Sequence, residues 1–282
     1  MKDIIHDIIK NKNNWGVTME IKEYVAQEKL ALKHAIEGLE NKPRLVIVQM
    51  NDDPASNAYV KGKLKDCDEV GIISELIKLP LDASEEELFN LLDELNNRDD
   101  VSGYIVQMPL PRHIDEEKVK LYVNPSKDVD GFHPCSSFVA CTPKGVIDYL
   151  KAEGVSFSGK NAVVIGRSNI VGRPLAKLLI DLSTNCTVLH SRTKEEDKIR
   201  YLENADLIFT AVGRKWLLDE TISYKSDAVI VDIGIIRDEG KLYGDCKPGL
   251  KVKLQTPVPG GVGLLTRLSL LKNVWEAYKN GI

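Results

Sequence analysis

The sequence predicts an α/β protein of two domains, each with a parallel sheet covered by helices. Short apolar segments alternate with longer segments in which apolar residues recur at helical spacing. This alternation occurs twice, before and after a loop-rich stretch at residues 124–134. A chain of 282 residues is long enough for two domains of ordinary size. Because strands that alternate with helices pair through right-handed crossovers, both sheets are expected to be parallel.

The first series of elements ends near the loop-rich stretch. The expected strands are 45–50, 72–79 and 103–107, and the expected helices are 55–70 and 84–97. Ser56 is expected to be the N-cap of helix 55–70, because its hydroxyl can accept a free backbone N–H. Gln107 ends strand 103–107 and precedes a Pro-rich turn. Active groups in such sheets lie beyond the C-terminal strand ends, so Gln107 is a candidate site residue.

The second series begins at residue 162 and has the order of a dinucleotide-binding domain. Its expected strands are 162–166, 187–189, 207–209 and 228–231, and a final helix begins at Thr266. We expect residues 143–266 to form this Rossmann-like domain. Residues 1–142 are expected to form the other domain, completed by the C-terminal helix 267–282, with the active-site cleft between the two domains.

A glycine turn follows the first strand of the second series. Its candidate cofactor-binding residues are Gly166, Arg167, Ser168, Val171 and Gly172. Such a turn lets the backbone approach a pyrophosphate, and the following helix presents free N–H groups and a positive dipole end. Ser168 occupies the second glycine position of the usual GxGxxG pattern, and glycine turns also occur for purely structural reasons. The repeated strand–helix pattern around this turn favours dinucleotide binding.

The end of the next strand distinguishes between the two nicotinamide cofactors. NAD sites place an acidic residue there for the ribose hydroxyls, whereas a 2′-phosphate requires cations and hydroxyls. Residues 190–193 contain Ser191 and Arg192 and no acid, and Arg167 is a second candidate cation. NADP is therefore favoured over NAD. The alternative is a solvated surface arginine beside a capping serine.

Composition and charge exclude several other classes of protein. The net charge of −4 and the dispersed Lys and Arg residues argue against nucleic acid as the main partner. No apolar run is long enough to span a membrane, and the first residues do not resemble a secretory signal. The five cysteines are scattered without a CxxC pair, so neither a disulfide framework nor a metal site is expected. Reduced thiols in the cytoplasm are the expected state.

Four polar residues of the first domain are candidates for a reaction site. Tyr59 and Lys63 are four residues apart on one predicted helix and therefore lie on one face. Taken alone, this pair fits a solvated lysine whose stem packs on a tyrosine. Gln107 ends a strand and Asp130 lies in a nearby loop, so the four side chains can orient a polar heterocycle and handle protons.

Six sequence segments together resemble one known family, the methylenetetrahydrofolate dehydrogenase/cyclohydrolase (FolD) family. They are Asp53–Lys63 (DPASNAYVKGK), Val106–Pro111 (VQMPLP), Lys127–Pro134 (KDVDGFHP), Cys141–Pro143 (CTP), Gly166–Pro174 (GRSNIVGRP) and Thr256–Gly263 (TPVPGGVG). The resemblance implies two reactions. A hydride passes from 5,10-methylenetetrahydrofolate to NADP, and the resulting methenyl compound is hydrolysed to 10-formyltetrahydrofolate. It also implies a homodimer.

The resemblance implies a role for each site residue. Lys63 is the central catalytic group, and Gln107 holds it in place. Tyr59 stacks on the aromatic part of the folate, and Asp130 orients the pterin through its amino group. Other residues would line the cleft: Pro259, Gly260 and Gly261 on the folate side, and Ile235 at the nicotinamide.

The chain departs from the family pattern in the segment between His133 and Cys141. This segment is shorter than is usual in the family, and Cys135-Ser136-Ser137 replaces an aromatic–Asn pair. In addition, Leu264-Leu265 replaces a Pro-Met pair. Three alternatives stay open: a dehydrogenase with a weak or absent cyclohydrolase step, a folate- or nucleotide-binding protein without turnover, and a related two-domain dehydrogenase that acts on a different small molecule.

Overall fold

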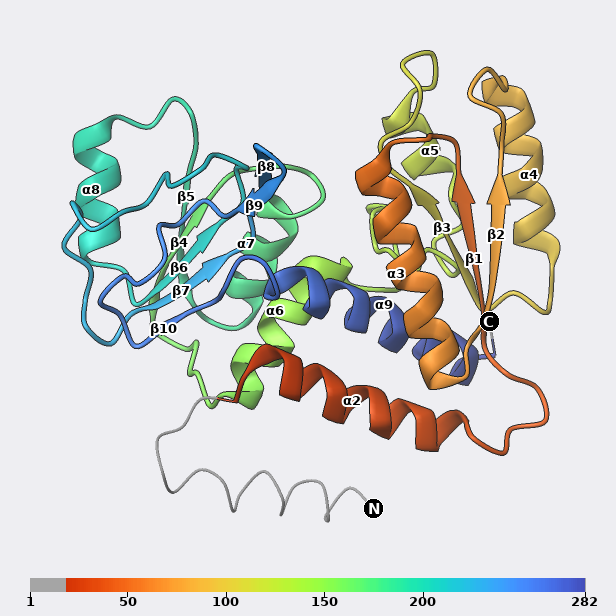
Figure 1. The fold of residues 1–282 in the computed structure, drawn as a ribbon, viewed down its shortest axis with the longest axis horizontal. Coiled ribbons are helices and arrows are strands. Elements are labelled where there is room, and N and C mark those ends of the chain that lie inside the picture. Colours follow the sequence, from red (N-terminus) through yellow and green to blue (C-terminus); the bar gives the residue numbers. More distant parts are fainter. Residues whose placement is uncertain (1–18, 282) are drawn as a thin grey trace. The chain divides into compact units, whose positions relative to one another are not determined.

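The computed structural model describes residues 19–281, which form two compact units of α/β architecture (Figure 1). We call residues 25–144 and 266–281 the Lys63 unit, and residues 19–24 and 145–265 the Gly166 unit. The sequence placed residues 19–24 with the first domain, whereas here they group with the Gly166 unit. Three helices contribute residues to both units. They are α2 (Ile21–Ile36), α6 (Cys141–Ala152) and α9 (Val262–Lys279).

The Lys63 unit contains a parallel sheet of strand order β2-β1-β3 (Figure 1). Its elements are β1 (Arg44–Gln49), α3 (Pro54–Val70), β2 (Ile73–Lys78), α4 (Glu85–Asn97), β3 (Gly103–Gln107) and α5 (Glu116–Tyr122). The predicted parallel order is confirmed, although the sequence did not predict α5. The register pairs Gln49 with Gln107 at the C-terminal ends of β1 and β3, which is the edge where a site was expected.

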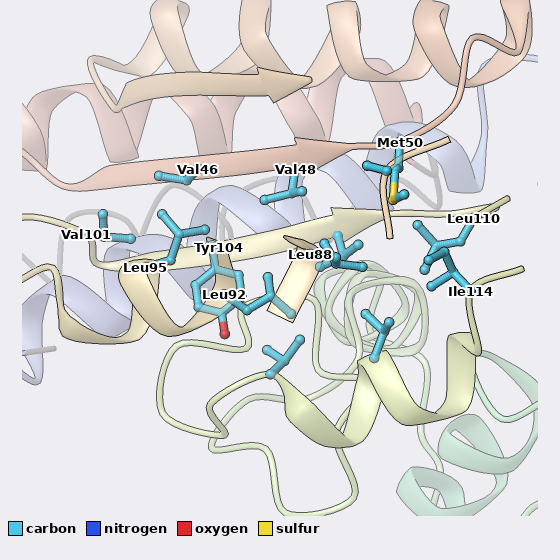
Figure 2. Packing of buried hydrophobic residues seen from close by; sticks show 14 residues of the cluster. Val46, Val48, Met50, Leu88, Leu92, Leu95, Val101, Tyr104, Leu110 and Ile114 are labelled. Atoms are coloured by element: carbon cyan, nitrogen blue, oxygen red, sulfur yellow. The ribbon is translucent and has the colours of Figure 1, made fainter. Parts of the chain in front are cut away.

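The core of the Lys63 unit lies between its sheet and helix α4 (Figure 2). Helix α4 begins with a capping box, in which Ser84 and Glu87 each satisfy a backbone N–H of the other. Its inward face buries Leu88, Leu92 and Leu95 against Tyr104 of β3. Burial of each such leucine stabilises the fold by roughly 1.5–3 kcal/mol. This packing fixes β3 and therefore the position of Gln107 at its end.

Helix α3 is capped by Asp53 and not by Ser56, so the predicted N-cap was wrong. The Asp53 carboxylate accepts a hydrogen bond of 2.7 Å from the backbone N–H of Ser56. Pro54 occupies the first turn, where its fixed φ favours the helix and its missing N–H costs nothing, so the helix begins before Ser56. Gly71 ends the helix in the left-handed conformation, with φ of 86°.

The Gly166 unit contains a parallel five-stranded sheet of order β10-β7-β6-β4-β5 (Figure 1). Its elements are β4 (Asn161–Ile165), α7 (Gly172–Asp181), β5 (Asn185–Leu189), α8 (Glu195–Glu203), β6 (Leu207–Thr210), β7 (Val229–Asp232), β8 (Ile236–Asp238), β9 (Lys241–Tyr243) and β10 (Leu254–Gln255). β5 lies on one side of β4 and β6 on the other, so the strand order reverses there. Open α/β sheets bind ligands at such a switch point.

Several short elements of the Gly166 unit were not predicted from the sequence. They are helix α8, the antiparallel hairpin β8–β9 and the edge strand β10. The C-terminal helix α9 begins at Val262, four residues before the expected start at Thr266. Among residues 19–281, no helix is both long enough and apolar enough to cross a membrane.

Candidate active site

Helix α3 and strand β3 bring three of the predicted site residues together. The ammonium of Lys63 donates a hydrogen bond of 3.1 Å to Oε1 of Gln107. The same ammonium lies 5.1 Å from the centre of the Tyr59 ring, within the range of a cation–π interaction. Lys63 is only 5% exposed, so its charge is largely removed from water. A lysine in this position is not the solvated surface charge that the spacing alone would suggest.

Gln107 is oriented by its neighbours so that its amide oxygen faces Lys63. Its side-chain amide donates a hydrogen bond of 2.8 Å to the carbonyl of Met108. Asn51 binds the backbone carbonyls of Gln107 and Pro109, at 3.3 and 2.9 Å. Because the side-chain NH₂ group is held in this way, Oε1 is free to accept the hydrogen bond from the Lys63 ammonium.

Asp130, the fourth predicted residue, lies within electrostatic reach of Lys63. Burial raises the pKa of the Asp130 carboxyl, while the Lys63 ammonium and a hydrogen bond from the Cys141 thiol lower it. Burial also raises the pKa of the Tyr59 phenol above its usual range, and the negative charge of Asp130 adds to this rise. The four predicted residues therefore form one group of coupled polar side chains in the Lys63 unit.

The loop that carries Asp130 is built around Asp128, which the sequence interpretation missed. The Asp128 carboxylate accepts hydrogen bonds from the backbone N–H groups of Gly131, at 3.1 Å, and His133, at 2.8 Å. Gly131 has φ of 73°, and a Cβ there would lie 2.5 Å from the backbone nitrogen of Ala140. The signal available in the sequence was a second acid two residues before Asp130, in the segment Asp128–Gly131.

The short segment after His133 is tied to the same loop. The hydroxyl of Ser136 donates to the carbonyl of Asp128, at 3.0 Å, and the backbone N–H of Ser137 donates to the carbonyl of Pro125, at 3.0 Å. Asn273 of α9 is fully buried and donates to the carbonyls of Val129 and Val139. The segment is therefore held by defined hydrogen bonds on both sides of Asp130.

The glycine turn after β4 contains close approaches of backbone that leave no room for a side chain at Gly166 or Gly172. Gly166 has φ of 117°, and a Cβ there would lie 2.6 Å from the carbonyl oxygen of Ala211. A Cβ on Gly172 would lie 2.7 Å from the carbonyl carbon of Gly166. The hydroxyl of Ser168 accepts hydrogen bonds from the N–H groups of Val171 and Gly172, at 3.2 and 3.3 Å. Ser168 thus organises the start of α7, where an anion binds most favourably.

The turn after β5 lies next to this glycine turn, because the backbone N–H of Gly166 donates to the carbonyl of Leu189. The turn is closed by hydrogen bonds from His190 N–H to Thr193 Oγ1, at 3.0 Å, and from Arg192 N–H to His190 Nδ1, at 3.2 Å. Ser191, Arg192 and Arg167 are all exposed. Hydroxyl and guanidinium groups without a carboxylate fit the 2′-phosphate of NADP.

Two buried acids, Asp232 and Asp245, organise the loops after β6 and β7, and both were missed by the sequence interpretation. The Asp245 carboxylate accepts hydrogen bonds from the N–H groups of Val212, at 2.8 Å, and Arg214, at 2.6 Å. The Asp232 carboxylate accepts from the N–H groups of Asp245, at 2.9 Å, and Cys246, at 2.8 Å. The loop that precedes Ile235 is held separately, by hydrogen bonds from the N–H groups of Ile233 and Gly234 to the carbonyl of Thr210. Ile235, the predicted nicotinamide contact, is 51% exposed.

The ionisation of Asp232 is expected to make stability depend on pH. Burial, together with the charge of Asp245, raises the pKa of Asp232 to about 6, from 3.8 in the unfolded chain. Between these values the native state keeps a proton that the unfolded state has lost, so the free energy of unfolding falls as pH rises from about 4 to about 6. The expected contribution is up to ~3 kcal/mol across this window.

Urea unfolding at pH 4.5 and pH 7.5 tests this expectation, with Asp232→Asn compared against the wild type. The wild-type advantage over Asp232→Asn should be larger at the lower pH. The matched control is Asp227→Asn, which alters an exposed carboxylate and should leave the pH dependence unchanged. Parallel pH dependences of the wild type and Asp232→Asn would contradict the assignment.

The turn that contains Pro259, Gly260 and Gly261 belongs to the Gly166 unit. Pro259 and Gly260 line a cavity of about 440 Å³, together with Lys22, Tyr149 and neighbouring residues of that unit. Gly260 has φ of 90°, and a Cβ on Gly261 would overlap the carbonyl oxygen of Pro257. The predicted contact of this turn with folate stays a prediction.

Two family models match separate parts of the chain. Residues 16–130 match the tetrahydrofolate dehydrogenase/cyclohydrolase catalytic domain, and residues 140–282 match the tetrahydrofolate dehydrogenase/cyclohydrolase NAD(P)-binding domain. Among curated proteins, the bifunctional protein FolD of Staphylococcus aureus strain bovine RF122 / ET3-1 is 43% identical over 274 residues. That match covers 92% of this chain and 95% of the relative.

Solved structures give the same result. The bifunctional FolD methylenetetrahydrofolate dehydrogenase/cyclohydrolase of Campylobacter jejuni is 39% identical, with a TM-score of 0.88, and the match covers 92% of this chain and 97% of that one. The Trypanosoma brucei N5,N10-methylenetetrahydrofolate dehydrogenase-cyclohydrolase, complexed with NADP cofactor and inhibitor, is 29% identical. Its TM-score is 0.88, and the match covers 94% of this chain and 97% of that one.

Proposed function

The chain belongs to the tetrahydrofolate dehydrogenase/cyclohydrolase family, and from this premise we propose that it is a bifunctional, NADP-dependent enzyme of one-carbon metabolism. It oxidises 5,10-methylenetetrahydrofolate to 5,10-methenyltetrahydrofolate with NADP and then hydrolyses this product to 10-formyltetrahydrofolate. The observation that carries the proposal is the buried hydrogen bond between Lys63 and Gln107 beside Tyr59 and Asp130.

The two chemical steps make different demands on the protein. Bound NADP accepts a hydride from the methylene carbon, so the protein has to hold the two reactants close together and exclude water. Hydrolysis begins from a cation that is already open to attack, so a single positioned water and one proton-handling group suffice. Lys63 fills this second role, because its ammonium is buried and has a fixed partner in Gln107.

The remaining residues of the Lys63 unit orient the folate. The Tyr59 ring stacks on the aromatic part of the substrate. Asp130 accepts hydrogen bonds from the pterin amino group, and the Asp128 loop holds it in place for that purpose. Tyr59 and Asp130 therefore fix the substrate, while Lys63 and Gln107 act on the one-carbon unit.

The Gly166 unit holds the cofactor and one side of the folate. The turn from Gly166 to Gly172 binds the pyrophosphate, and Ser168 and Val171 of this turn contact it. Ser191, Arg192 and Arg167 bind the 2′-phosphate. Ile235 contacts the nicotinamide, and the turn at Pro259, Gly260 and Gly261 lines the folate. The close approaches at Gly166 and Gly172 and the absence of an acid at residues 190–193 support NADP as the cofactor.

A pair of assays on the purified protein tests the proposed function. One follows the reduction of NADP or NAD with 5,10-methylenetetrahydrofolate, and the other follows the loss of methenyltetrahydrofolate absorbance. We expect activity in both assays, with NADP preferred over NAD. Tight binding of NADP without any absorbance change in either assay would instead favour the alternative of a folate- or nucleotide-binding protein without turnover.

The short segment between His133 and Cys141 supports one further candidate, a dehydrogenase with a weak or absent hydrolytic step. Cys135-Ser136-Ser137 stands where the family has an aromatic–Asn pair, and the segment adjoins the Asp130 loop. Reduction of NADP with accumulation of the methenyl product would favour this candidate. Loss of the methenyl absorbance at a rate that keeps pace with its formation would exclude it.

We further propose that the enzyme is a cytoplasmic homodimer without nucleic-acid or membrane partners. The resemblance to the family and the absence of basic clusters in the sequence support this. Light scattering of the purified protein measures the subunit number directly, and a mass of one chain would contradict the dimer.

A further inference from the structure

Helix α3 contains a glycine, Gly62, directly before Lys63. Glycine in a helix interior costs about 0.5–1 kcal/mol relative to alanine, so its presence requires a reason. The space beside Gly62 is filled by Arg267, which projects from α9. A Cβ on Gly62 would overlap the terminal nitrogen of this guanidinium and lie 3.2 Å from its Cζ. Gly62 therefore provides the room in which Arg267 lies against the backbone of α3.

Arg267 reaches past Gly62 to a buried carboxylate of the same helix. Its Nε lies 3.0 Å from Oδ2 of Asp66, whose side chain is 5% exposed. This contact is an ion pair by distance, without an aligned hydrogen bond at Oδ2. The other oxygen of Asp66 accepts a hydrogen bond of 2.6 Å from Lys29 of α2, and Lys29 also binds Glu69. We call Lys29, Asp66, Glu69 and Arg267 the Asp66 cluster.

The Asp66 cluster adjoins the site residues of α3. Asp66 follows Lys63 by three residues and so lies on the same side of the helix. Arg267 also acts on Tyr59, since its positive charge lowers the pKa of the phenol against the stronger effect of burial. Burial raises the pKa of the Cys67 thiol, and the charge of Asp66 adds to this rise. The charges of Lys63 and Lys29 lower the same pKa, so all three charges lie near this buried thiol.

The cluster contains two cations and two carboxylates, so its formal charge is zero. A buried carboxylate that loses one of two cationic partners keeps an uncompensated charge, and the surrounding groups must respond to it. Tyr59 and Lys63 of the candidate active site lie on the same helix as Asp66. The two proposed reactions do not themselves require ion pairs between α2, α3 and α9. The Asp66 cluster is therefore a feature that the proposed mechanism leaves unexplained.

On the premise of the proposed function, we propose that Arg267 is a positioning residue for Lys63, acts through Asp66, and depends on the space left by Gly62. The ion pair links α9 to the face of α3 on which Tyr59 and Lys63 lie. It also compensates the charge of the Asp66 carboxylate, which lies on the same side of α3 as Lys63. Arg267 does not itself contact the reacting atoms in this proposal.

The charge of the cluster gives the proposal a signature in the pH profile of hydrolysis. The titratable and polar groups around Lys63 are Tyr59, Asp66 and Cys67 of α3, Gln107 of β3, Asp130 of the loop, Cys141 of α6, and, through Asp66, Lys29 and Arg267. Removal of the Arg267 charge makes the surroundings of Lys63 more negative. Removal of the Asp66 charge has the opposite effect. The two changes should move the ionisation midpoint of the hydrolysis rate in opposite directions.

Two single variants, Arg267→Met and Gly62→Ala, and their combination test the dependence on Gly62. Gly62→Ala displaces only the end of a flexible side chain and improves helix propensity, so the variant should still fold, with a loss of stability because Asp66 loses one cationic partner. We expect each single variant to lower kcat of hydrolysis by about tenfold, the effect of losing one charged contact. The double variant should lose no more than either single one, because a displaced guanidinium has no further effect to lose.

The pH profile is measured for the same variants and for Asp66→Asn. Arg267→Met and Gly62→Ala should shift the midpoint to higher pH, and Asp66→Asn should shift it to lower pH. Lys272→Met is the matched control, because Lys272 of α9 pairs with Glu28 of α2 and so joins two of the same helices without touching Asp66. This control should lose stability without a change in kcat or midpoint.

The outcomes separate this inference from the proposed function. An active wild type combined with an unchanged kcat and midpoint in Gly62→Ala would overturn the inference alone. Multiplicative losses in the double variant would also overturn it, since Gly62 and Arg267 would then act independently. A wild type that is inactive in both assays would overturn the proposed function and this inference with it.

Discussion

Lys63→Met is expected to lower the rate of methenyltetrahydrofolate hydrolysis by roughly 10²–10⁴-fold, the range that a positioned proton-handling group supplies. Methionine keeps most of the apolar stem and removes the ammonium, so the packing of α3 is preserved. Gln107 loses the donor at its Oε1, and an unmade hydrogen bond of this kind costs about 1–3 kcal/mol. Removal of a buried charge offsets part of that cost. NADP binding should survive, because its predicted contacts lie in the Gly166 unit.

The matched control for this variant is Lys65→Met, which makes the same substitution at an exposed position of the same helix. It should leave both activities unchanged. Hydrolysis is followed by loss of methenyl absorbance, and NADP binding by the rise in melting temperature on addition of NADP. Hydrolysis at the wild-type rate in Lys63→Met, together with an intact Gln107, would remove Lys63 from the proposed mechanism.

The fold could be predicted from the sequence wherever local pattern and tertiary environment agree. Apolar runs such as 45–50 and 162–166 are buried central strands, and central strands of parallel sheets are apolar on both faces. The prediction failed at elements with few apolar residues. Strands β8, β9 and β10 have two or three residues each and are only partly buried, so they leave no periodic signal.

The error at the start of α3 has a local cause. Asp53 and Ser56 are both good N-cap residues, and the sequence offers both within four positions. Pro54 decides between them, since it favours the first helical turn and so places the cap at Asp53. The proline therefore indicates that the helix begins at Pro54.

The proposed catalytic side chains could be selected from the sequence, but the residues packed around them could not. Tyr59 and Lys63 share a helix face by spacing alone, and Gln107 ends a strand. By contrast, Arg267 and Asp66 are about two hundred positions apart, and only the packing of α9 on α3 brings them together. Asp245 is likewise an ordinary acid in the sequence until the loops that it binds are placed around it.

Gly172→Ala is expected to have the opposite effect to Lys63→Met. NADP binding should weaken by at least about tenfold, and hydrolysis should be retained. The added Cβ would lie 2.7 Å from the carbonyl carbon of Gly166 and 2.9 Å from Cα of Arg167. Both are backbone atoms, so the turn itself must move to relieve the overlap. Overpacking of this kind destabilises a protein by about 1–3 kcal/mol.

The physical reason for the loss of NADP binding is the geometry of the start of α7. Its first N–H groups and its dipole favour an anion only where the preceding turn lets the pyrophosphate approach them closely. A displaced turn also breaks the hydrogen bonds from Val171 and Gly172 to Ser168, which order those N–H groups. Hydrolysis consumes no NADP, so its rate should change by less than about twofold. A tenfold loss of rate would instead correspond to about 1.4 kcal/mol of lost transition-state stabilisation.

The comparison variant for Gly172→Ala is Ile180→Ala, which truncates an exposed side chain on the same helix, α7. It tests whether any small change in α7 weakens NADP binding, and it should leave the NADP-induced rise in melting temperature unchanged. If Gly172→Ala kept a wild-type rise in melting temperature, the cofactor would have to bind elsewhere. If Gly172→Ala lowered hydrolysis as strongly as NADP binding, the turn would be needed for the stability of the whole protein and not for the cofactor site alone. The reason is that Tyr59, Lys63, Gln107 and Asp130 all lie outside the turn.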